Sequence, residues 1–259
     1  MLARQRQASI LDSVRERGAA RVAELVESLA VSEMTVRRDL DALAERGLVT
    51  RVHGGVIAVS GASDEPGYAV KAGRQTAEKA AIAAAAAVLV APGAAVGISA
   101  GTTTAALARA LCAVPELTVV TNSIPVAAVF HHHGRPDHTV VLTGGTRTRS
   151  DALVGPVAQR AIERTNVDLV FLGVHGMSGR AGFTTPNLAE AETDRALVAA
   201  ARRLVVVADH TKWGLVGLAT VAALDEAHVV VSDAGLTADA RAELGARVEQ
   251  LVIAERESM

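Results

Sequence analysis

Six short apolar runs rich in valine recur after residue 90, and each ends at a polar or glycine-bearing loop. The runs are AAVGIS (94–99), LTVVT (117–121), HTVVLT (138–143), VDLVFLG (167–173), RLVVVA (203–208) and HVVVS (228–232). Segments with a helical pattern, such as 102–112 and 188–201, lie between them. Short unbroken apolar runs that alternate with helices are typical of parallel strands covered on both faces. The pattern therefore predicts an α/β domain over residues 74–259, with a mostly parallel sheet and helices on both faces.

Composition narrows the class of protein. The chain has 259 residues, 50% of them hydrophobic, which is enough for two folded domains. Its net charge of −2 means that any affinity for nucleic acid must come from a local basic face. The lone Cys112 cannot form an intramolecular disulfide, which suits a reducing compartment. Because the longest apolar run, 80–91, is shorter than the roughly 20 residues of a membrane helix, we expect a cytoplasmic protein without a membrane partner.

The first 59 residues have a different, helical and charged pattern. One helix carries Ile10, Leu11 and Val14, and a second carries the apolar face of 22–29. Ser32 is a suitable N-cap for a third helix. The stretch SGASDEPGYAVKAG follows, rich in glycine, serine, aspartate and proline. We therefore expect a helical domain over 1–59, a linker over 60–73 and the α/β domain from 74 onward.

The third helix and the segment after it predict a DNA-reading surface. Val36, Leu40 and Leu43 fall at i, i+4 and i+7, so they face the core and leave the intervening polar residues toward solvent. The following LVTRVHGGVIAV alternates into a two-stranded ribbon around Gly54 and Gly55. Two short helices, a tight turn and a ribbon beside them are typical of helix-turn-helix proteins, whose second helix enters the major groove.

The sequence VAELVESLAVSEMTVRRDLDALAERGLVTRVHGG resembles the winged helix-turn-helix signature of DeoR-type bacterial transcriptional regulators. The resemblance implies that Ser32, Thr35, Arg37 and Arg38 lie on the recognition helix, and that Arg51 and His53 lie on the wing. An arginine there can pair with guanine or neutralise a phosphate. The alternatives are that the two helix arginines form a solvated face balanced by neighbouring aspartates, and that these helices bind protein instead of DNA.

The loop after the first strand of the α/β domain is a candidate anion site. It comprises Ser99, Gly101, Thr102, Thr103 and Thr104 and leads directly into a helix. Glycine admits a ligand to the backbone, and the free amides of a helix start favour a phosphate. The loop matches neither the P-loop nor the GxGxxG pattern. The alternative is a plain capped turn.

The other strand ends add polar groups that we expect on the same rim, since ligands of such sheets bind at the carboxyl ends of the strands. These residues are Asn122, Gly144, Gly145, Arg147, Gly173, Asp209 and Lys212. In the DeoR resemblance these segments are similar to a sensor domain related in fold to ribose-phosphate isomerases and CoA transferases. The resemblance thus implies a phosphorylated sugar or related metabolite as effector.

Two positions depart from the family pattern. Ser99 stands where the family usually carries aspartate, and Asp194 stands where lysine is more common. Losing an acid that binds sugar hydroxyls and exchanging a cation for an anion alter which ligand fits. Glu190 and Glu192 lie close to Asp194 in the sequence. The identity of the effector is therefore left open.

The sequence gives less support to an enzymatic function than to a regulatory one. An isomerase needs a positioned acid or base, for which Asp151, Glu190 and Asp209 are candidates. We identify no nucleophile beside a base, no metal and no cofactor, since the adjacent histidines 131–133 splay around a helix. We expect a repressor that binds a double-stranded operator as a homodimer or homotetramer. A sugar-phosphate isomerase or transferase with an appended helical domain is the alternative.

Overall fold

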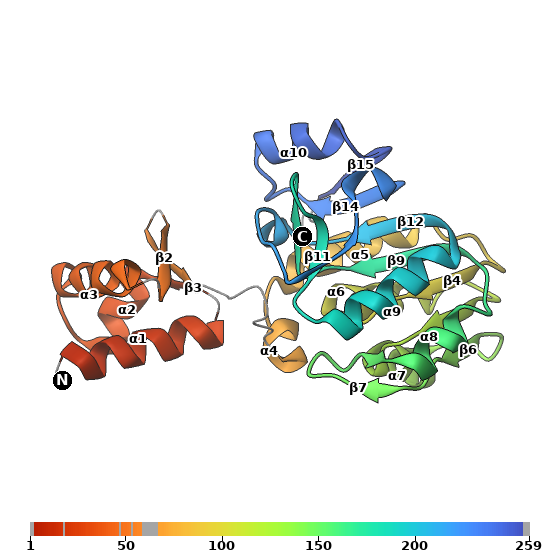
Figure 1. Ribbon diagram of the computed structural model, residues 1–259, viewed down its shortest axis with the longest axis horizontal. Coiled ribbons are helices and arrows are strands. Elements are labelled where there is room, and N and C mark those ends of the chain that lie inside the picture. Colours follow the sequence, from red (N-terminus) through yellow and green to blue (C-terminus); the bar gives the residue numbers. More distant parts are fainter. Residues whose placement is uncertain (1–2, 18, 47, 53, 59–66, 256–259) are drawn as a thin grey trace. The chain divides into compact units, whose positions relative to one another are not determined.

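Figure 1 shows the computed structural model of the protein, which describes residues 3–17, 19–46, 48–52, 54–58 and 67–255. The chain forms two compact units, Met1–Gly61 and Ala62–Met259. The first unit contains a helix-turn-helix with a small sheet, and the second alternates strands and helices. The predicted fold class is confirmed. Within the described residues, no helix is both long enough and apolar enough to cross a membrane.

The described part of the first unit packs three helices against three short strands. In chain order these elements are α1 (Ala3–Arg17), β1 (Ala19–Arg21), α2 (Val22–Leu29), α3 (Glu33–Glu45), β2 (Val49–Val52) and β3 (Gly55–Ala58). Their apolar faces form one core, to which α1 contributes Ile10 and Val14. Val36, Leu40 and Leu43 of α3 are fully buried, which confirms the prediction from their spacing.

The wing has one strand more than the predicted two-stranded ribbon. β2 and β3 pair antiparallel, and β1 pairs with the other side of β3. With only three residues, β1 is too short to show a strand period in the sequence. Gly55 makes the close approach possible, because a Cβ there would lie 2.4 Å from the carbonyl oxygen of Ala20. Gly54 has a φ of +82°, which glycine adopts without strain.

A tight turn joins the two helices of the motif. Helix α2 ends at Leu29, and Ala30 then takes the left-handed conformation with φ 52° and ψ 44°. Ser32 caps α3, because its side chain accepts a hydrogen bond from the Thr35 amide at 3.3 Å. The predicted N-cap is thus confirmed, and it satisfies an amide that a helix start leaves without a partner.

The second unit has the predicted alternation of helices and strands. Its described helices are α4 (Tyr68–Ala72), α5 (Thr76–Ala87), α6 (Thr102–Leu111), α7 (Ile124–His133), α8 (Pro156–Ile162), α9 (Leu188–Ala199) and α10 (Ala238–Gly245), with the 3₁₀ helices η1 (His210–Lys212) and η2 (Leu224–Glu226). Its described strands are β4 (Ala95–Ile98), β5 (Thr118–Thr121), β6 (Thr139–Leu142), β7 (Thr146–Arg147), β8 (Leu153–Val154), β9 (Val167–Gly173), β10 (Gly176–Ser178), β11 (Gly182–Thr185), β12 (Ala201–Val207), β13 (Ala219–Ala222), β14 (Val229–Asp233) and β15 (Gln250–Ala254).

A seven-stranded sheet in the order β15-β14-β12-β9-β4-β5-β6 forms the centre of this unit. Every neighbouring pair in it is parallel. Six of these strands are the apolar runs that predicted the sheet. The seventh, β15, was not predicted, because its short apolar run is flanked by Glu249 and Glu255. The unit also contains two small antiparallel sheets, β10-β11-β13 and β7-β8, that the sequence did not indicate.

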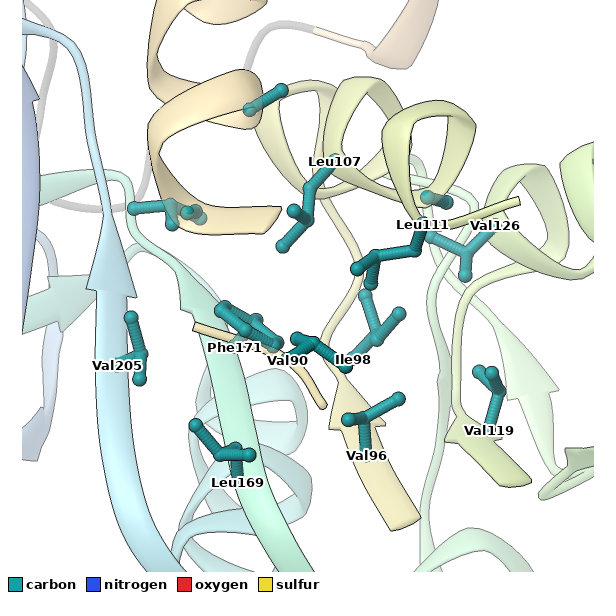
Figure 2. Packing of buried hydrophobic residues seen from close by; sticks show 14 of the residues in the cluster. Val90, Val96, Ile98, Leu107, Leu111, Val119, Val126, Leu169, Phe171 and Val205 are labelled. Carbon is teal, nitrogen blue, oxygen red and sulfur yellow. The ribbon is translucent and has the colours of Figure 1, made fainter. Parts of the chain in front are cut away.

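The sheet separates two hydrophobic cores. Ile98 and Phe171 belong to the core beneath α5, α6 and α7, whose packing Figure 2 shows. Val170 and Leu172, the alternate residues of β9, belong to the core on the other face, together with residues of α8, α9 and α10. This alternation follows from the period of two along a strand. It confirms helices on both faces of the sheet.

Helix α4 lies inside the segment 60–73 that the sequence predicted as a linker. Tyr68 packs against the core beneath α5 and α6, and its amide donates a hydrogen bond to the Arg149 carbonyl at 3.3 Å. Residues 67–73 therefore belong to the second unit. The glycine, serine and proline that signal a linker are concentrated before Tyr68, and the five-residue helix after them is too short to show a helical period.

The left-handed Ala30 predicts a stabilising substitution. This conformation costs a residue with a Cβ about 1–2 kcal/mol, whereas glycine there loses about 0.5–1 kcal/mol through chain entropy. We expect Ala30→Gly to raise the unfolding free energy of the first unit by about 0.5–1 kcal/mol. Hydrogen exchange of the buried amides of α3 in the intact protein measures it. The control Ala44→Gly, within the right-handed helix, should lower this free energy by about 1 kcal/mol. A loss of stability in Ala30→Gly would show that the turn is unstrained.

Candidate functional site

The direction of the chain through the central sheet reverses between β4 and β9. From β4 the chain moves outward to β5 and β6, then returns to β9 on the other side of β4 and continues to β12, β14 and β15. At such a switch point the connections leave in opposite directions, so a crevice opens at the carboxyl ends of the two strands. A hydrogen bond from the Gly173 amide to Ser99 Oγ, 2.9 Å long, joins the two strand ends.

A pocket with about 550 Å³ of empty space, its open mouth included, lies at this crevice. The pocket is lined by Lys71, Ala100, Gly101, Thr102, Thr103, Ser150, Gly173, Val174, His175, Thr185, Glu190, Asp194 and Lys212. Five predicted effector residues are among them, namely Gly101, Thr102, Thr103, Gly173 and Lys212.

The N-terminus of α6 forms one wall. Gly101 precedes the helix in an extended conformation, and Thr102 and Thr103 follow in its first turn. Thr104 is fully buried and does not line the pocket, because its hydroxyl donates to the Gly101 carbonyl at 3.0 Å. The first amides of a helix lack intrahelical acceptors and carry the positive end of the helix dipole. This wall is therefore suited to an anionic group.

Two lysines from distant parts of the chain line the same pocket. Lys71 comes from α4, and its ammonium donates to Ser150 Oγ at 3.3 Å. Lys212 comes from η1, which follows β12. Asp209 caps η1, since its Oδ1 accepts from the Thr211 amide at 3.1 Å and from the Thr211 hydroxyl. Asp209 is buried and caps the turn that carries Lys212, and its contact with a sugar stays a prediction.

Helix α9 brings two carboxylates to the pocket. Glu190 and Asp194 lie one turn apart and are only 7% and 8% exposed. The Thr148 hydroxyl donates to Glu190 Oε1 at 2.5 Å. Asn187 caps α9 by accepting from the Ala189 and Glu190 amides at 2.9 and 3.2 Å. Carboxylates held in this way accept hydrogen bonds from hydroxyl or amino groups of a ligand.

Other predicted effector residues lie behind the pocket. Ser99 and Asn122 are both fully buried. Asn122 Oδ1 accepts from the Ala100 amide at 3.0 Å, which fixes the loop that leads into α6. Its Nδ2 is buried and has no hydrogen-bond partner in the described part of the chain. Asn122 therefore shapes the loop that carries the anion wall.

The predicted residues Gly144, Gly145 and Arg147 follow β6 and do not line the pocket. A Cβ on Gly145 would lie 2.5 Å from the Val154 carbonyl oxygen, so this glycine permits the β7-β8 pairing. Arg147 is 65% exposed and pairs with Asp151 at 2.5 Å. The strand β6 lies at the sheet edge, which explains why its carboxyl end does not meet the crevice.

Sequence reasoning missed several lining residues. Lys71 was placed in the linker, Ser150 and His175 lie on connections without a recognisable motif, and Thr185 ends the short strand β11, which the sequence did not indicate. Asp194 was noted as a position that affects which ligand fits, and Glu190 as a residue near it in the sequence. Only the position of His175 two residues after the end of β9 was a usable signal.

A third lysine lies buried beside the pocket. Lys79 of α5 is 6% exposed, and its ammonium donates to the carbonyls of Lys71 at 2.6 Å and Arg74 at 2.5 Å. Burial lowers the pKa of Lys79 from 10.5 to about 8. The charge of Asp209 opposes this pKa shift, while Lys212 and other basic neighbours add to it.

The lowered pKa of Lys79 makes stability depend on pH. Between pH 8 and 10.5 the unfolded chain binds more protons at this position than the folded protein, so the stability due to Lys79 rises with pH. Below pH 8 the ammonium is charged in both states, and its cost of burial is constant. We expect the unfolding free energy of the natural protein, relative to Lys79→Met, to increase from pH 7.5 to pH 10. Urea unfolding at several pH values measures it, and a flat or falling difference would mean that burial does not lower this pKa.

The predicted DNA-reading residues lie on α3 and the wing of the first unit. Ser32 Oγ lies 2.8 Å from the Thr35 hydroxyl at the start of α3. Arg37 is exposed and pairs with Glu33 at 2.6 Å, and Arg38 is also exposed. These side chains share the solvent side of the helix with Met34, which is 74% exposed.

The strand β2 of the wing carries the predicted Arg51. Arg51 of β2 pairs with Asp41 of α3 at 3.3 Å, which ties the wing to the helix. His53 lies outside the described residues. Asp39 does not balance the arginines on the surface, because it is buried and bonded to Arg6 and Gln7 of α1. The ion pair between Asp39 and Arg6 therefore holds α3 against α1.

Both units match known family models. Residues 6–61 match the DeoR-like helix-turn-helix domain, and residues 74–234 match the DeoR C terminal sensor domain. A solved structure of ribose 5-phosphate isomerase A from Neisseria gonorrhoeae is 17% identical, with a TM-score of 0.40 over 54% of each chain. The relation in fold to ribose-phosphate isomerases stays a prediction.

Three known proteins are similar along most of their length. The HTH-type transcriptional regulator GlpR of Haloferax volcanii is 38% identical over 94% of this chain and 95% of its own. The uncharacterized HTH-type transcriptional regulator YgbI of Escherichia coli is 35% identical over 99% and 100%, and the glycerol-3-phosphate regulon repressor of the same species is 32% identical over 89% and 90%. Matches of this extent in both units show that the chain belongs to the DeoR family of helix-turn-helix transcriptional regulators.

Proposed function

We propose that the protein is a repressor of carbohydrate-metabolism genes, and that a phosphorylated sugar or related metabolite bound in the pocket modulates its binding to operator DNA. The proposal is supported by the lining of the pocket, where the amino-terminal turn of α6, two lysines and two buried carboxylates come together. The glycerol-3-phosphate regulon repressor of Escherichia coli, a relative along most of the chain, is named for a phosphorylated metabolite.

The distribution of groups in the pocket fits such a ligand. A phosphate gains from the α6 amides at Thr102 and Thr103 and from the ammonium groups of Lys71 and Lys212. Hydroxyl groups of a sugar donate hydrogen bonds to carboxylates such as Glu190 and Asp194. A ligand with an anionic end and a hydroxylated end therefore uses both parts of the lining.

The proposed contacts with DNA follow from the exposed face of α3. Thr35, near the helix start, is placed to reach base edges, while Arg37, Arg38 and Arg51 supply the positive charge that a nearly neutral chain needs locally. Helix-turn-helix proteins of this kind bind two half-sites about 10.5 base pairs apart or a multiple of that, so we infer a homodimer or homotetramer. A protein that acts on DNA in this way works in the cytoplasm.

We infer that the pocket binds a regulatory ligand and does not catalyse a reaction. The relatives described above are named as transcriptional regulators and a repressor. For a ligand to release the operator, it must bind the DNA-competent state more weakly than the alternative state. Coupling of about 1–3 kcal/mol is typical and corresponds to a change of about 5–150-fold in affinity.

Substitution of the α3 arginines tests the DNA interface. We expect Arg38→Ala and Arg37→Ala each to weaken binding to the promoter fragment of the protein's own gene and to reduce the slope of log affinity against log salt by about one unit. Fluorescence anisotropy over a series of salt concentrations measures both effects. Arg202→Ala removes the same charge from an exposed position of the second unit and should change neither. If all three substitutions had equal effects on affinity and salt dependence, the arginines of α3 would not contact the DNA.

A second substitution tests the pocket. Gly101 lines it, and a Cβ there would lie 3.0 Å from Thr104 Oγ1 and 3.9 Å from Gly173 Cα. We expect Gly101→Val to abolish the response of operator binding to sugar phosphates and to leave operator affinity without ligand within about threefold. The measurement is an anisotropy titration with glycerol 3-phosphate, fructose 1-phosphate and ribose 5-phosphate. If a compound still released the operator from the Gly101→Val protein, the effector site would not be this pocket.

A further inference from the structure

The first unit exposes two large apolar side chains in its described part. They are Met34 of α3, which is 74% exposed, and Val52 of β2, which is 44% exposed. A single exposed apolar residue is common on protein surfaces, so its position decides whether it has a role. Both residues lie on the elements that carry the predicted DNA-reading residues, and Met34 directly precedes Thr35. The exposed apolar surface of this unit therefore coincides with the proposed DNA interface.

Met34 lies on the side of α3 that faces away from the core. It is the second residue of the helix, whose N-cap is Ser32. Successive residues of an α-helix are about 100° apart around its axis, which places Met34 nearly opposite the buried Val36. The exposed Arg38, one turn further on, lies on the same side as Met34. In helix-turn-helix proteins the first residues of this helix approach the base edges, so Met34 is placed among them.

The polar neighbours of Met34 have partners within α3. Ser32 Oγ accepts a hydrogen bond from the Thr35 amide and lies 2.8 Å from the Thr35 hydroxyl. The carboxylate of Glu33 pairs with the guanidinium of Arg37 at 2.6 Å. At the start of α3, Met34 is thus a large side chain that the protein leaves mostly uncovered.

The charges around Met34 favour a polyanionic partner. Glu33 and Asp41 are paired with Arg37 and Arg51, so Arg38 adds a positive charge to this surface beyond those of the two pairs. A partner that covers Met34 and Arg38 together must offer a negative group and an apolar group close to each other. The phosphates and base edges of double-stranded DNA provide both.

The chemistry of methionine restricts what it can recognise in DNA. Its side chain has no hydrogen-bond donor, and its thioether sulfur is a weak acceptor. It therefore cannot distinguish bases by their donor and acceptor patterns. The apolar group that standard bases present in the major groove is the C5-methyl group of thymine. An unbranched, flexible side chain such as methionine adapts its shape to such a group.

We propose that Met34 reads thymine, by packing its side chain against the C5-methyl group of a thymine in each half-site of the operator. The inference rests on the proposed function, because it requires that α3 binds in the major groove. Arg38 supplies charge beside this contact, and Met34 supplies selectivity for one base. Removing one methyl group from water contributes about fourfold in affinity, so the contact is worth about this factor at each half-site.

Deoxyuridine provides a direct test, because uracil differs from thymine in lacking the C5-methyl group. The promoter fragment of the protein's own gene is prepared once with thymine and once with uracil throughout, and fluorescence anisotropy measures the affinity of the full-length protein for each. We expect the natural protein to bind the uracil fragment at least about fourfold more weakly. Single replacements of thymine by uracil should then assign this loss to one thymine in each half-site. A loss spread evenly over all thymines overturns the proposal.

Met34→Gln isolates the contribution of the methionine. Glutamine is also unbranched and has a similar helix propensity, so α3 stays intact. This variant should bind the uracil fragment as the natural protein does, and it should show less than about half of the natural preference for the thymine fragment. Val52→Thr is the matched control, because it removes the other exposed apolar group of this unit while keeping its shape. It should keep the full preference for thymine.

The outcomes separate this proposal from the proposed function. If the natural protein binds neither fragment at low salt, the proposed function itself is contradicted. If it binds both fragments equally, or if Met34→Gln keeps the full preference for thymine, the reading of thymine by Met34 is overturned. Met34→Gln that weakens binding to both fragments equally also overturns it, since Met34 would then be covered by something other than a thymine methyl, such as a second copy of the chain. A preference lost in Val52→Thr alone would assign the methyl contact to the wing and overturn the role of Met34.

Discussion

The pocket depends on the contact between the ends of β4 and β9. These neighbouring strands send their connections to opposite sides of the sheet, and the bond from the Gly173 amide to Ser99 Oγ keeps their ends together. The loop after β4 then turns into α6, so that the amides of the helix start line the crevice. Helices α4 and α9 and the turn η1 add charged groups around this fixed point. The order of the strands thus determines where the pocket lies, and the loops and helices around it supply its charged and hydrogen-bonding groups.

The charges around the pocket are arranged in opposing sets. Lys71 and Lys212 come from a short helix and a 3₁₀ turn, whereas Glu190 and Asp194 come from the stable helix α9. Lys71 lies on a five-residue helix without a buried residue, whereas Glu190 and Asp194 are buried residues of α9, which is anchored in a core.

Much of the fold was predictable from the sequence, because the apolar runs and the helical spacing of apolar residues each extend over a whole strand or helix. The valine-rich runs gave β9 and β12, and the spacing of Val36, Leu40 and Leu43 gave the buried face of α3. The three-residue β1 and five-residue α4 were not predictable, since neither spans a full period of its pattern. The strand ends predicted the loops after β4, β9 and β12 at the crevice, but they wrongly included the loop after the edge strand β6 and did not predict which side chains line the pocket. Asp209 and Asn122 therefore proved to hold the loops behind the pocket.

A ligand that regulates operator binding must bind with different affinity to the free and to the DNA-bound protein. Calorimetric titration of the same sugar phosphate into the protein alone, and into the protein saturated with its operator, measures this difference directly. If the ligand releases the operator, its dissociation constant must be about 5–150-fold higher for the DNA-bound protein, because coupling is reciprocal. Equal dissociation constants for the two forms would contradict the account, since a ligand that does not distinguish them cannot regulate DNA binding.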